Sequence, residues 1–84
     1  MTGSAQVVLI TGGGSGMGRE AARRFASRGE TVALLDVDTT GMQETTAGFD
    51  NAHSFTVDIT DFAAVSSTIQ EIEASLGPIG KLYN

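Results

Sequence analysis

The chain has no cysteine, one histidine and few basic residues, and each shortage excludes a class of site. Without cysteine there can be neither a disulfide framework nor a thiolate metal site, and the single histidine, His53, excludes a multi-histidine metal centre. Five basic residues against ten acidic ones leave a net charge of −5. That balance argues against binding to nucleic acid or to an anionic membrane surface. We therefore expect no metal site and no nucleic-acid partner.

Long apolar runs are also missing from the sequence. The longest runs, such as residues 7–10, are far shorter than the ~20 residues of a membrane-spanning helix. A secretory signal would need a positively charged segment followed by an apolar stretch at the N-terminus. The sequence shows no such pattern there, so we expect no secretory signal. At 84 residues, the chain has the length of one small domain or of part of a larger one. We expect a soluble, cytoplasmic protein without a membrane partner.

Glycine, by contrast, is abundant: the chain has eleven, and five of them lie between Gly12 and Gly18. This cluster separates an apolar, β-branched run over residues 7–11 from a helical pattern over residues 17–28. An apolar run without alternation is typical of a strand buried on both faces, as in parallel sheets. At such a strand-to-helix turn, glycines let the backbone approach a phosphate closely, and the helix N-terminus offers unpaired N–H groups.

The alternation of strand and helix continues along the chain. Further strands are predicted over residues 31–36, 54–57 and 81–84, and further helices over residues 39–47 and 61–76. The order β-α-β-α-β-α-β implies right-handed crossovers and a parallel sheet. The predicted fold class is α/β, as the first half of a Rossmann-like doubly wound parallel sheet.

The helical patterns also predict which side chains face the sheet. Over residues 17–28, Met17, Ala21 and Phe25 recur every four residues on one side, and the arginines between them are expected to face solvent. For the helix over residues 61–76, Thr60 or Asp61 is the expected N-cap. Its predicted apolar stripe consists of Phe62, Val65, Ile69, Ile72 and Leu76.

The glycine loop reads Thr-Gly-Gly-Gly-Ser-Gly-Met-Gly over residues 11–18. A G-x-G-x-x-G match that begins at the first glycine would place Met17 at the third glycine, so this fingerprint fails. A P-loop fails too, because Arg19 and Glu20 stand where it needs a lysine and a Ser or Thr. The spacing that fits is T-G-x-x-x-G-x-G, which resembles the cofactor loop of the short-chain dehydrogenases/reductases. The resemblance extends over the whole chain.

Asp36 is the second informative residue, because it ends the strand over residues 31–36, about 20 residues after the loop. A carboxylate at this place can accept hydrogen bonds from both hydroxyls of an adenosine ribose, and it repels a 2′-phosphate. NADP-binding members of the resembled family usually carry a basic residue where Ser15 or Val37 stands here. The cofactor predicted is therefore NAD rather than NADP.

The resemblance implies roles for residues farther along the chain. In this family an Asp after the third strand and the aliphatic residue that follows it contact the adenine ring, which implies this role for Asp58 and Ile59. From the residues alone, Asp58 could equally cap the helix that begins at Asp61. Asn84 matches a family asparagine near the adenosine ribose. The implied cofactor-binding residues are Gly12, Gly14, Ser15, Gly16, Met17, Gly18, Asp36, Val37, Asp58, Ile59 and Asn84.

The catalytic residues of the family, a Ser and a Tyr-x-x-x-Lys pair, cannot be placed in this sequence. The only tyrosine, Tyr83, is followed by a single residue, so no catalytic residue is assigned. Residues 1–84 are therefore expected to be the N-terminal dinucleotide-binding half-domain of an oxidoreductase, inactive alone. The resemblance implies hydride transfer between a nicotinamide cofactor and an alcohol or carbonyl substrate.

A non-catalytic module that binds the ADP part of NAD is the alternative. In either case the strand over residues 81–84 would be an open apolar edge, which invites pairing. We expect the remainder of the enzyme or another chain to cover it. The resemblance further implies a homo-oligomer for the full-length form.

Overall fold

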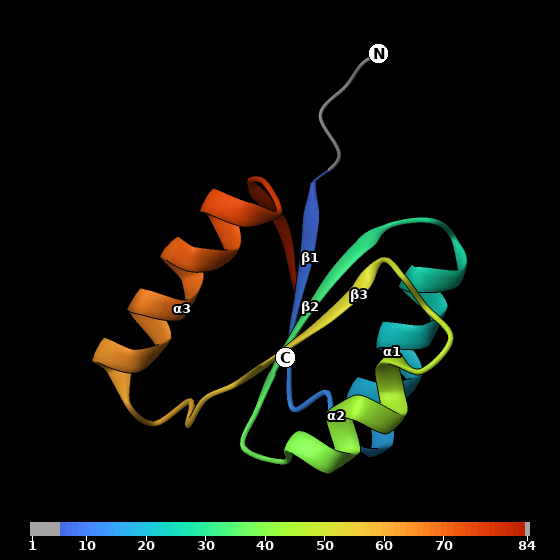
Figure 1. Ribbon diagram of the computed structural model, residues 1–84, viewed down its shortest axis with the longest axis horizontal. Helices are drawn as coiled ribbons and strands as arrows, with labels where there is room; N and C mark the ends of the chain where they lie inside the picture. The colour runs from blue at the N-terminus through green and yellow to red at the C-terminus, as the bar shows by residue number, and fades with distance from the viewer. Residues whose placement is uncertain (1–5, 84) are drawn as a thin grey trace.

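The computed structural model describes residues 6–83 and shows a four-stranded parallel sheet with helices on both faces (Figure 1). The strands are β1 (Val7–Thr11), β2 (Thr31–Asp36), β3 (Ala52–Thr56) and β4 (Ile79–Tyr83). The helices are α1 (Gly16–Ser27), α2 (Thr39–Thr46) and α3 (Phe62–Ser75). The predicted α/β class and the predicted order of strands and helices are confirmed.

The strands lie in the order β3-β2-β1-β4. From β1 the chain moves outward through β2 to β3, and it then returns to place β4 on the free side of β1. Because each crossover is right-handed, this reversal of direction puts α1 and α2 on one face and α3 on the other, as Figure 1 shows. It also creates a switch point between β1 and β4, and ligands of such sheets bind there, outside the carboxyl ends of the strands.

Side chains of β1 and β2 alternate between the two faces, so the sheet has two cores. The core beneath α1 and α2 consists of Val8, Ile10, Ala21, Ala22, Ala26, Val32, Leu34 and Met42. The core beneath α3 consists of Val7, Leu9, Ala33, Leu35, Val57 and Ile72. Both central strands are thus buried on both faces, which is why their sequences are continuously apolar.

Two strands begin earlier than predicted. β4 begins at Ile79 because the Val7 N–H donates to the carbonyl oxygen of Pro78 (2.9 Å), so pairing with β1 starts directly after the proline. β3 begins at Ala52, which lies opposite Val32 in the parallel register, and it ends one residue before the predicted end. In both cases main-chain pairing extends the strand into residues whose side chains carry no strand pattern.

Two side chains that were predicted to face the sheet do not. Met17 is 75% exposed and Phe62 is 86% exposed. Each lies in the first turn of its helix, and Figure 1 shows that this end of α3 stands away from the strands. Farther along the helices the prediction is closer, since Ala21 and Ile72 are buried.

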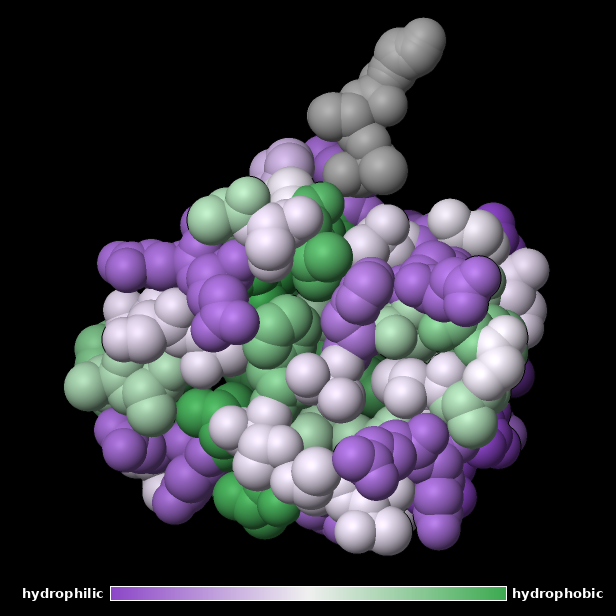
Figure 2. All heavy atoms as spheres, viewed as in Figure 1, coloured by the Kyte–Doolittle hydropathy of each residue, from purple (hydrophilic) through white to green (hydrophobic). Residues whose placement is uncertain are grey.

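Apolar residues remain exposed near the switch point and at the β4 edge. On the face drawn in Figure 2, a strip of apolar residues (green) runs between polar and charged ones. The large exposed hydrophobic side chains of the described residues are Met17, Val37, Ile59, Phe62 and Leu82. No helix within residues 6–83 has the length and apolarity needed to cross a membrane.

The start of α3 distinguishes two neighbouring carboxylates. Asp61 is the N-cap, and its Oδ1 accepts the Ala64 N–H (3.1 Å). Asp58 does not cap the helix, because its Oδ1 accepts both the N–H (2.9 Å) and the hydroxyl (2.7 Å) of Thr60. The alternative that Asp58 is the helix cap is therefore wrong, and the prediction of Asp61 is confirmed.

Replacing Asp61 by Ala should lower the free energy of unfolding by about 0.5–2 kcal/mol, the usual cost of losing an N-cap. Asp58→Ala is the matched control, and it should lower that free energy by less, since it leaves the helix cap intact. Urea unfolding without nucleotide measures both. A larger loss for Asp58→Ala than for Asp61→Ala would contradict the assignment of the cap.

Candidate functional site

The loop between β1 and α1 brings main chain to the switch point. The Gly12 N–H donates to the Leu35 carbonyl oxygen (2.8 Å), so the ladder with β2 continues one residue beyond β1. A Cβ on Gly18 would overlap the Gly12 carbonyl group, so glycine there lets the first turn of α1 approach the strand end. Gly16 has φ of +62°, which other residues adopt only with strain, and a Cβ on it would point into open space.

The first turn of α1 offers main-chain N–H groups that could bind an anion. Ser15 is the N-cap residue, yet its side chain makes no capping hydrogen bond to the described residues, and the first turn carries no acidic residue. The other two helices are capped by carboxylates, Asp38 on α2 and Asp61 on α3. Free N–H groups and the positive end of the helix dipole favour a negatively charged group beside α1.

Asp36 ends β2 with its carboxylate turned to the glycine loop. Oδ2 accepts the Gly14 N–H (2.9 Å), and Oδ1 accepts the Val37 N–H (2.7 Å) and, at 3.3 Å, the Asp38 N–H. The two oxygens thus tie together the ends of β1 and β2, which the sequence separates by more than 20 residues. A carboxylate has about four acceptor positions, and these three donors leave one of them free on Oδ2. Asp36 can therefore accept one hydrogen bond from a ligand, and a second where a ligand hydroxyl replaces the Asp38 N–H at 3.3 Å.

A hollow of about 140 Å³ lies beside Asp36, and we call it the Asp36 hollow. Its lining residues come from the ends of all three strands on this side of the sheet: Gly12, Leu35, Asp36, Val37, Val57, Asp58 and Ile59. Five predicted cofactor residues therefore meet in one place. Gly14, Ser15, Gly16, Met17 and Gly18 lie in the adjacent loop and first turn of α1, whereas Asn84 is outside the described residues.

Hydrogen bonds from Thr60 keep the Asp58 carboxyl in its ionised form, which can accept hydrogen bonds. The hydroxyl of Thr60, and then its main-chain N–H, lower the pKa of the Asp58 carboxyl below its ordinary value of 3.8. Both donors stabilise the ionised form, and burial opposes them only weakly because the group is exposed. At neutral pH the Asp36 hollow is therefore bordered by an exposed carboxylate at the end of β3.

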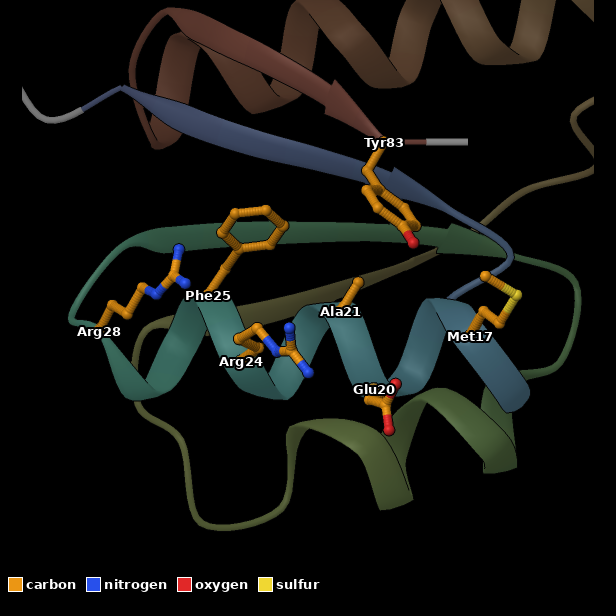
Figure 3. Close-up of a pocket in the computed structure, with 7 residues that line it drawn as sticks. All are labelled: Met17, Glu20, Ala21, Arg24, Phe25, Arg28 and Tyr83. Carbon is orange, nitrogen blue, oxygen red and sulfur yellow. The ribbon is translucent and has the colours of Figure 1, made fainter.

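A second hollow, of about 250 Å³, lies along α1 on the side that faces β4, and we call it the α1 groove (Figure 3). Ala21, Phe25 and Tyr83 give it apolar walls, and Arg24 and Arg28 border it. The Tyr83 ring packs edge-on against Phe25, with centroids 6.4 Å apart. Although the α1 groove is larger, Met17 is the only predicted cofactor residue among its lining. We therefore place the candidate site at the Asp36 hollow.

The arginines of α1 were predicted to face solvent, and for Arg19 this is wrong. Its guanidinium crosses to α2 and donates to the carbonyl oxygens of Gly14 (2.7 Å) and Gly41 (3.1 Å) and to the hydroxyl of Thr45 (3.0 Å). Arg19 also pairs with the Glu44 carboxylate (3.0 Å). The helical pattern could not reveal this role, because the other acceptors are two main-chain carbonyls and one threonine far along the sequence. The site therefore includes a contact between loop and helix that sequence reasoning missed.

A glycine loop at the switch point, an uncapped helix and a carboxylate ending the next strand are the arrangement of dinucleotide-binding α/β proteins. Known proteins narrow this class. Residues 6–84 match the family described as short chain dehydrogenase. The chain belongs to this family, the short-chain dehydrogenases/reductases, as the resemblance implied.

The similar proteins are dehydrogenases and reductases. The chain is 37% identical over 81 residues to meso-2,3-butanediol dehydrogenase of Serratia marcescens and 33% identical over 76 residues to 2-dehydro-3-deoxy-L-rhamnonate dehydrogenase (NAD(+)) of a Sphingomonas species. These matches cover 94% and 90% of this chain but 32% and 30% of the relatives. The chain thus spans about a third of their length.

Solved structures agree with the sequence comparisons. The structure of 3-ketoacyl-(acyl-carrier-protein) reductase from Brucella melitensis, complexed with NADH, has a TM-score of 0.86 and 32% identity. A short chain dehydrogenase from Bacillus anthracis has a TM-score of 0.86 and 29% identity. In each case the match covers 94% of this chain and 33% of the other. The fold and its Rossmann-like strand order are therefore those of the family.

Thr60→Ala should raise the pKa of the Asp58 carboxyl toward its ordinary value, because the hydroxyl is the larger cause of its depression. NMR titration of the carboxyl signals measures this pKa. Thr68→Ala is the control, because it removes a hydroxyl that donates to the Ala64 carbonyl oxygen and not to Asp58. Since folding lowers this pKa, the ionised group stabilises the fold above pH 3.8, and this contribution is lost as the pH falls through the folded value. An unchanged pKa in Thr60→Ala would contradict the assignment.

Proposed function

We propose that residues 1–84 form the N-terminal dinucleotide-binding half-domain of an oxidoreductase that uses NAD(H). The observation that carries the proposal is the position of the Asp36 carboxylate, which is held by the Gly14 N–H (2.9 Å) at the rim of the Asp36 hollow. A ribose with two free hydroxyls suits such an acceptor, since both hydroxyls can donate to it. The uncapped first turn of α1 lies next to it for the diphosphate.

Each part of the site suits one part of the cofactor. The diphosphate would lie against Gly12, Gly14, Ser15, Gly16, Met17 and Gly18. The adenine would lie between the exposed apolar side chains of Val37 and Ile59, 64% and 54% exposed, with the carboxylate of Asp58 at its amino group. Asn84 would contribute near the ribose. Open space over Gly12 and Gly16, where a Cβ would meet nothing within 4 Å, supports the close approach of a ligand.

NAD rather than NADP is favoured by charge. A 2′-phosphate at the ribose would meet the Asp36 carboxylate, and like charges repel. Among residues 6–83, Arg19 is the arginine bonded to the glycine loop, and its guanidinium is already used in hydrogen bonds to the loop and to α2. One relative carries NAD(+) in its name, and one similar structure is complexed with NADH.

When bound, the nicotinamide would supply the chemistry: it would accept a hydride from an alcohol or donate one to a carbonyl substrate. The residues of this segment bind and orient the adenosine and diphosphate ends. At about 140 Å³, the Asp36 hollow is below the ~300–1,000 Å³ of a complete small-molecule site, so further protein segments complete it. The family relationship favours an enzyme over a non-catalytic module, because the similar proteins named here are dehydrogenases and a reductase.

Calorimetry on the full chain tests the proposal. We expect NAD to bind more tightly than NADP, and we expect Asp36→Ala to weaken NAD binding by roughly tenfold or more, as for loss of hydrogen bonds to a charged group. NADP binding should change little or improve. Asp50→Ala, at an exposed turn before β3, is the control and should leave both affinities unchanged. A wild-type protein that prefers NADP would contradict the assignment of Asp36.

Gly16→Ala tests the diphosphate loop. It should cost about 1–2 kcal/mol of stability because of the positive φ, and it should reduce NAD affinity far more, because its Cβ occupies the open space beside the loop. Gly29→Ala is a matched control, since Gly29 has φ of +85° and also has nothing near its Cβ position. It should lose similar stability, measured by thermal unfolding, and keep its NAD affinity. Equal affinities for the two variants would argue against a ligand at Gly16.

A further inference from the structure

The glycine loop is attached to α2 by a polar contact that the proposed cofactor site does not use. The Nη2 atom of Arg19 lies 2.7 Å from the Gly14 carbonyl oxygen, 3.1 Å from that of Gly41 and 3.0 Å from Glu44 Oε1. Its Nε donates to the Thr45 hydroxyl (3.0 Å). One guanidinium therefore joins the loop after β1, the first turn of α2 and the last turn of α2.

Thr45 of α2 also takes part in this contact, through its side-chain hydroxyl. It is 1% exposed, and its hydroxyl, which accepts from Arg19, can donate its own proton to the carbonyl oxygen of Gly13 (2.8 Å) or of Gly41 (3.0 Å). The two main chains are close here, because a Cβ on Gly41 would overlap the carbonyl oxygen of Gly14. We call Arg19, Thr45 and these carbonyl groups the loop clamp.

The loop clamp acts on the same peptide units that hold Asp36. Gly14 gives its carbonyl oxygen to Arg19 and its N–H to Asp36 Oδ2 (2.9 Å). A Cβ on Gly14 would lie 2.7 Å from that same Oδ2, so little freedom remains between the loop and the carboxylate. Gly14 thus holds Oδ2 of the carboxylate, while the N–H groups of Val37 and Asp38 hold Oδ1.

We propose that Arg19 and Thr45 are positioning residues that set the choice between NAD and NADP by fixing Gly14 and, through it, the Asp36 carboxylate. This inference rests on the proposed function. Neither residue needs to touch the cofactor. A carboxylate held in one place can accept from both ribose hydroxyls and repel a 2′-phosphate, whereas a loose carboxylate can do neither well.

Variants of the full chain test the loop clamp. Arg19→Met and Thr45→Val should each lower the ratio Kd(NADP)/Kd(NAD) by roughly threefold to tenfold, the range expected for losing one intramolecular hydrogen bond. Arg23→Met is the matched control, because Arg23 also donates to α2 carbonyl oxygens, those of Glu44 (2.9 Å) and Thr45 (3.5 Å), without reaching the loop. It should keep the wild-type ratio. Thr45→Ser keeps the hydroxyl and should keep the ratio as well.

The sign of the change separates positioning from direct contact. If Arg19 attracted the 2′-phosphate itself, its removal would weaken NADP binding and raise the ratio, which would overturn the proposal. Loss of stability alone lowers the folded fraction for both ligands and leaves the ratio unchanged. Calorimetry measures the two dissociation constants separately.

Hydrogen exchange without nucleotide tests the loop clamp independently of the cofactor. The peptide over residues 12–18, read by mass spectrometry, should exchange faster in Arg19→Met and Thr45→Val than in wild type, and at the wild-type rate in Arg23→Met. If Thr45→Val folds poorly, the exchange rate of residues 12–18 in Arg19→Met can still be compared with that in Arg23→Met.

The outcomes distinguish the two proposals. A wild-type protein that prefers NAD, with neither ratio nor exchange altered in Arg19→Met and Thr45→Val, overturns the loop clamp and leaves the proposed function standing. A wild-type protein that binds neither NAD nor NADP overturns the proposed function, and with it the role of the loop clamp in cofactor choice.

Discussion

The hydrogen bond from the Gly14 N–H to the Asp36 carboxylate (2.9 Å) is the interaction on which the candidate site depends. It joins the loop after β1 to the end of β2, so two segments that are distant in sequence form one edge. A carboxylate beside a main-chain amide is a strong and directional contact. Because Asp36 also accepts the N–H of Val37 (2.7 Å), the whole turn after β2 is oriented by one side chain.

The sheet makes this contact possible. In the strand order β3-β2-β1-β4, β1 and β2 are adjacent and parallel, so their carboxyl ends meet on the same side. Both strands are buried on both faces, which holds their ends in place. The reversal that brings β4 to the other side of β1 then leaves the glycine loop at the one point where no crossover covers it.

Function follows from what is left free around this edge. Within the part of the chain that the structure describes, no side chain caps α1, whereas Asp38 and Asp61 cap the other two helices. Val37 and Ile59 line the Asp36 hollow and remain exposed, although apolar side chains of this size are usually buried. The chain belongs to the short-chain dehydrogenases/reductases, and the proposed cofactor site would use both features, since free amides suit a diphosphate and apolar walls suit a planar base.

The fold class, the place of the glycine loop and the place of Asp36 at the end of a strand could all be predicted from the sequence. These are local signals: an unbroken apolar run predicts a buried strand, and a glycine cluster before a helical pattern predicts a turn with free amides. The start of β4 was predicted too late, because the side chains of its first residues carry no strand pattern. Main-chain pairing with Val7 decides where this strand begins. Met17 and Phe62 were misplaced because the helical period does not say how far a helix overlaps the sheet.

Three contacts depend on how the folded chain packs: Arg19 faces α2, Thr45 is buried beneath the loop, and Gly41 lets the two main chains approach. The partners in these contacts are mostly main-chain carbonyl groups, which every residue carries and which therefore leave no pattern in a sequence. They become specific acceptors when the parallel sheet brings the loop after β1 against α2, and that packing is a property of the whole fold.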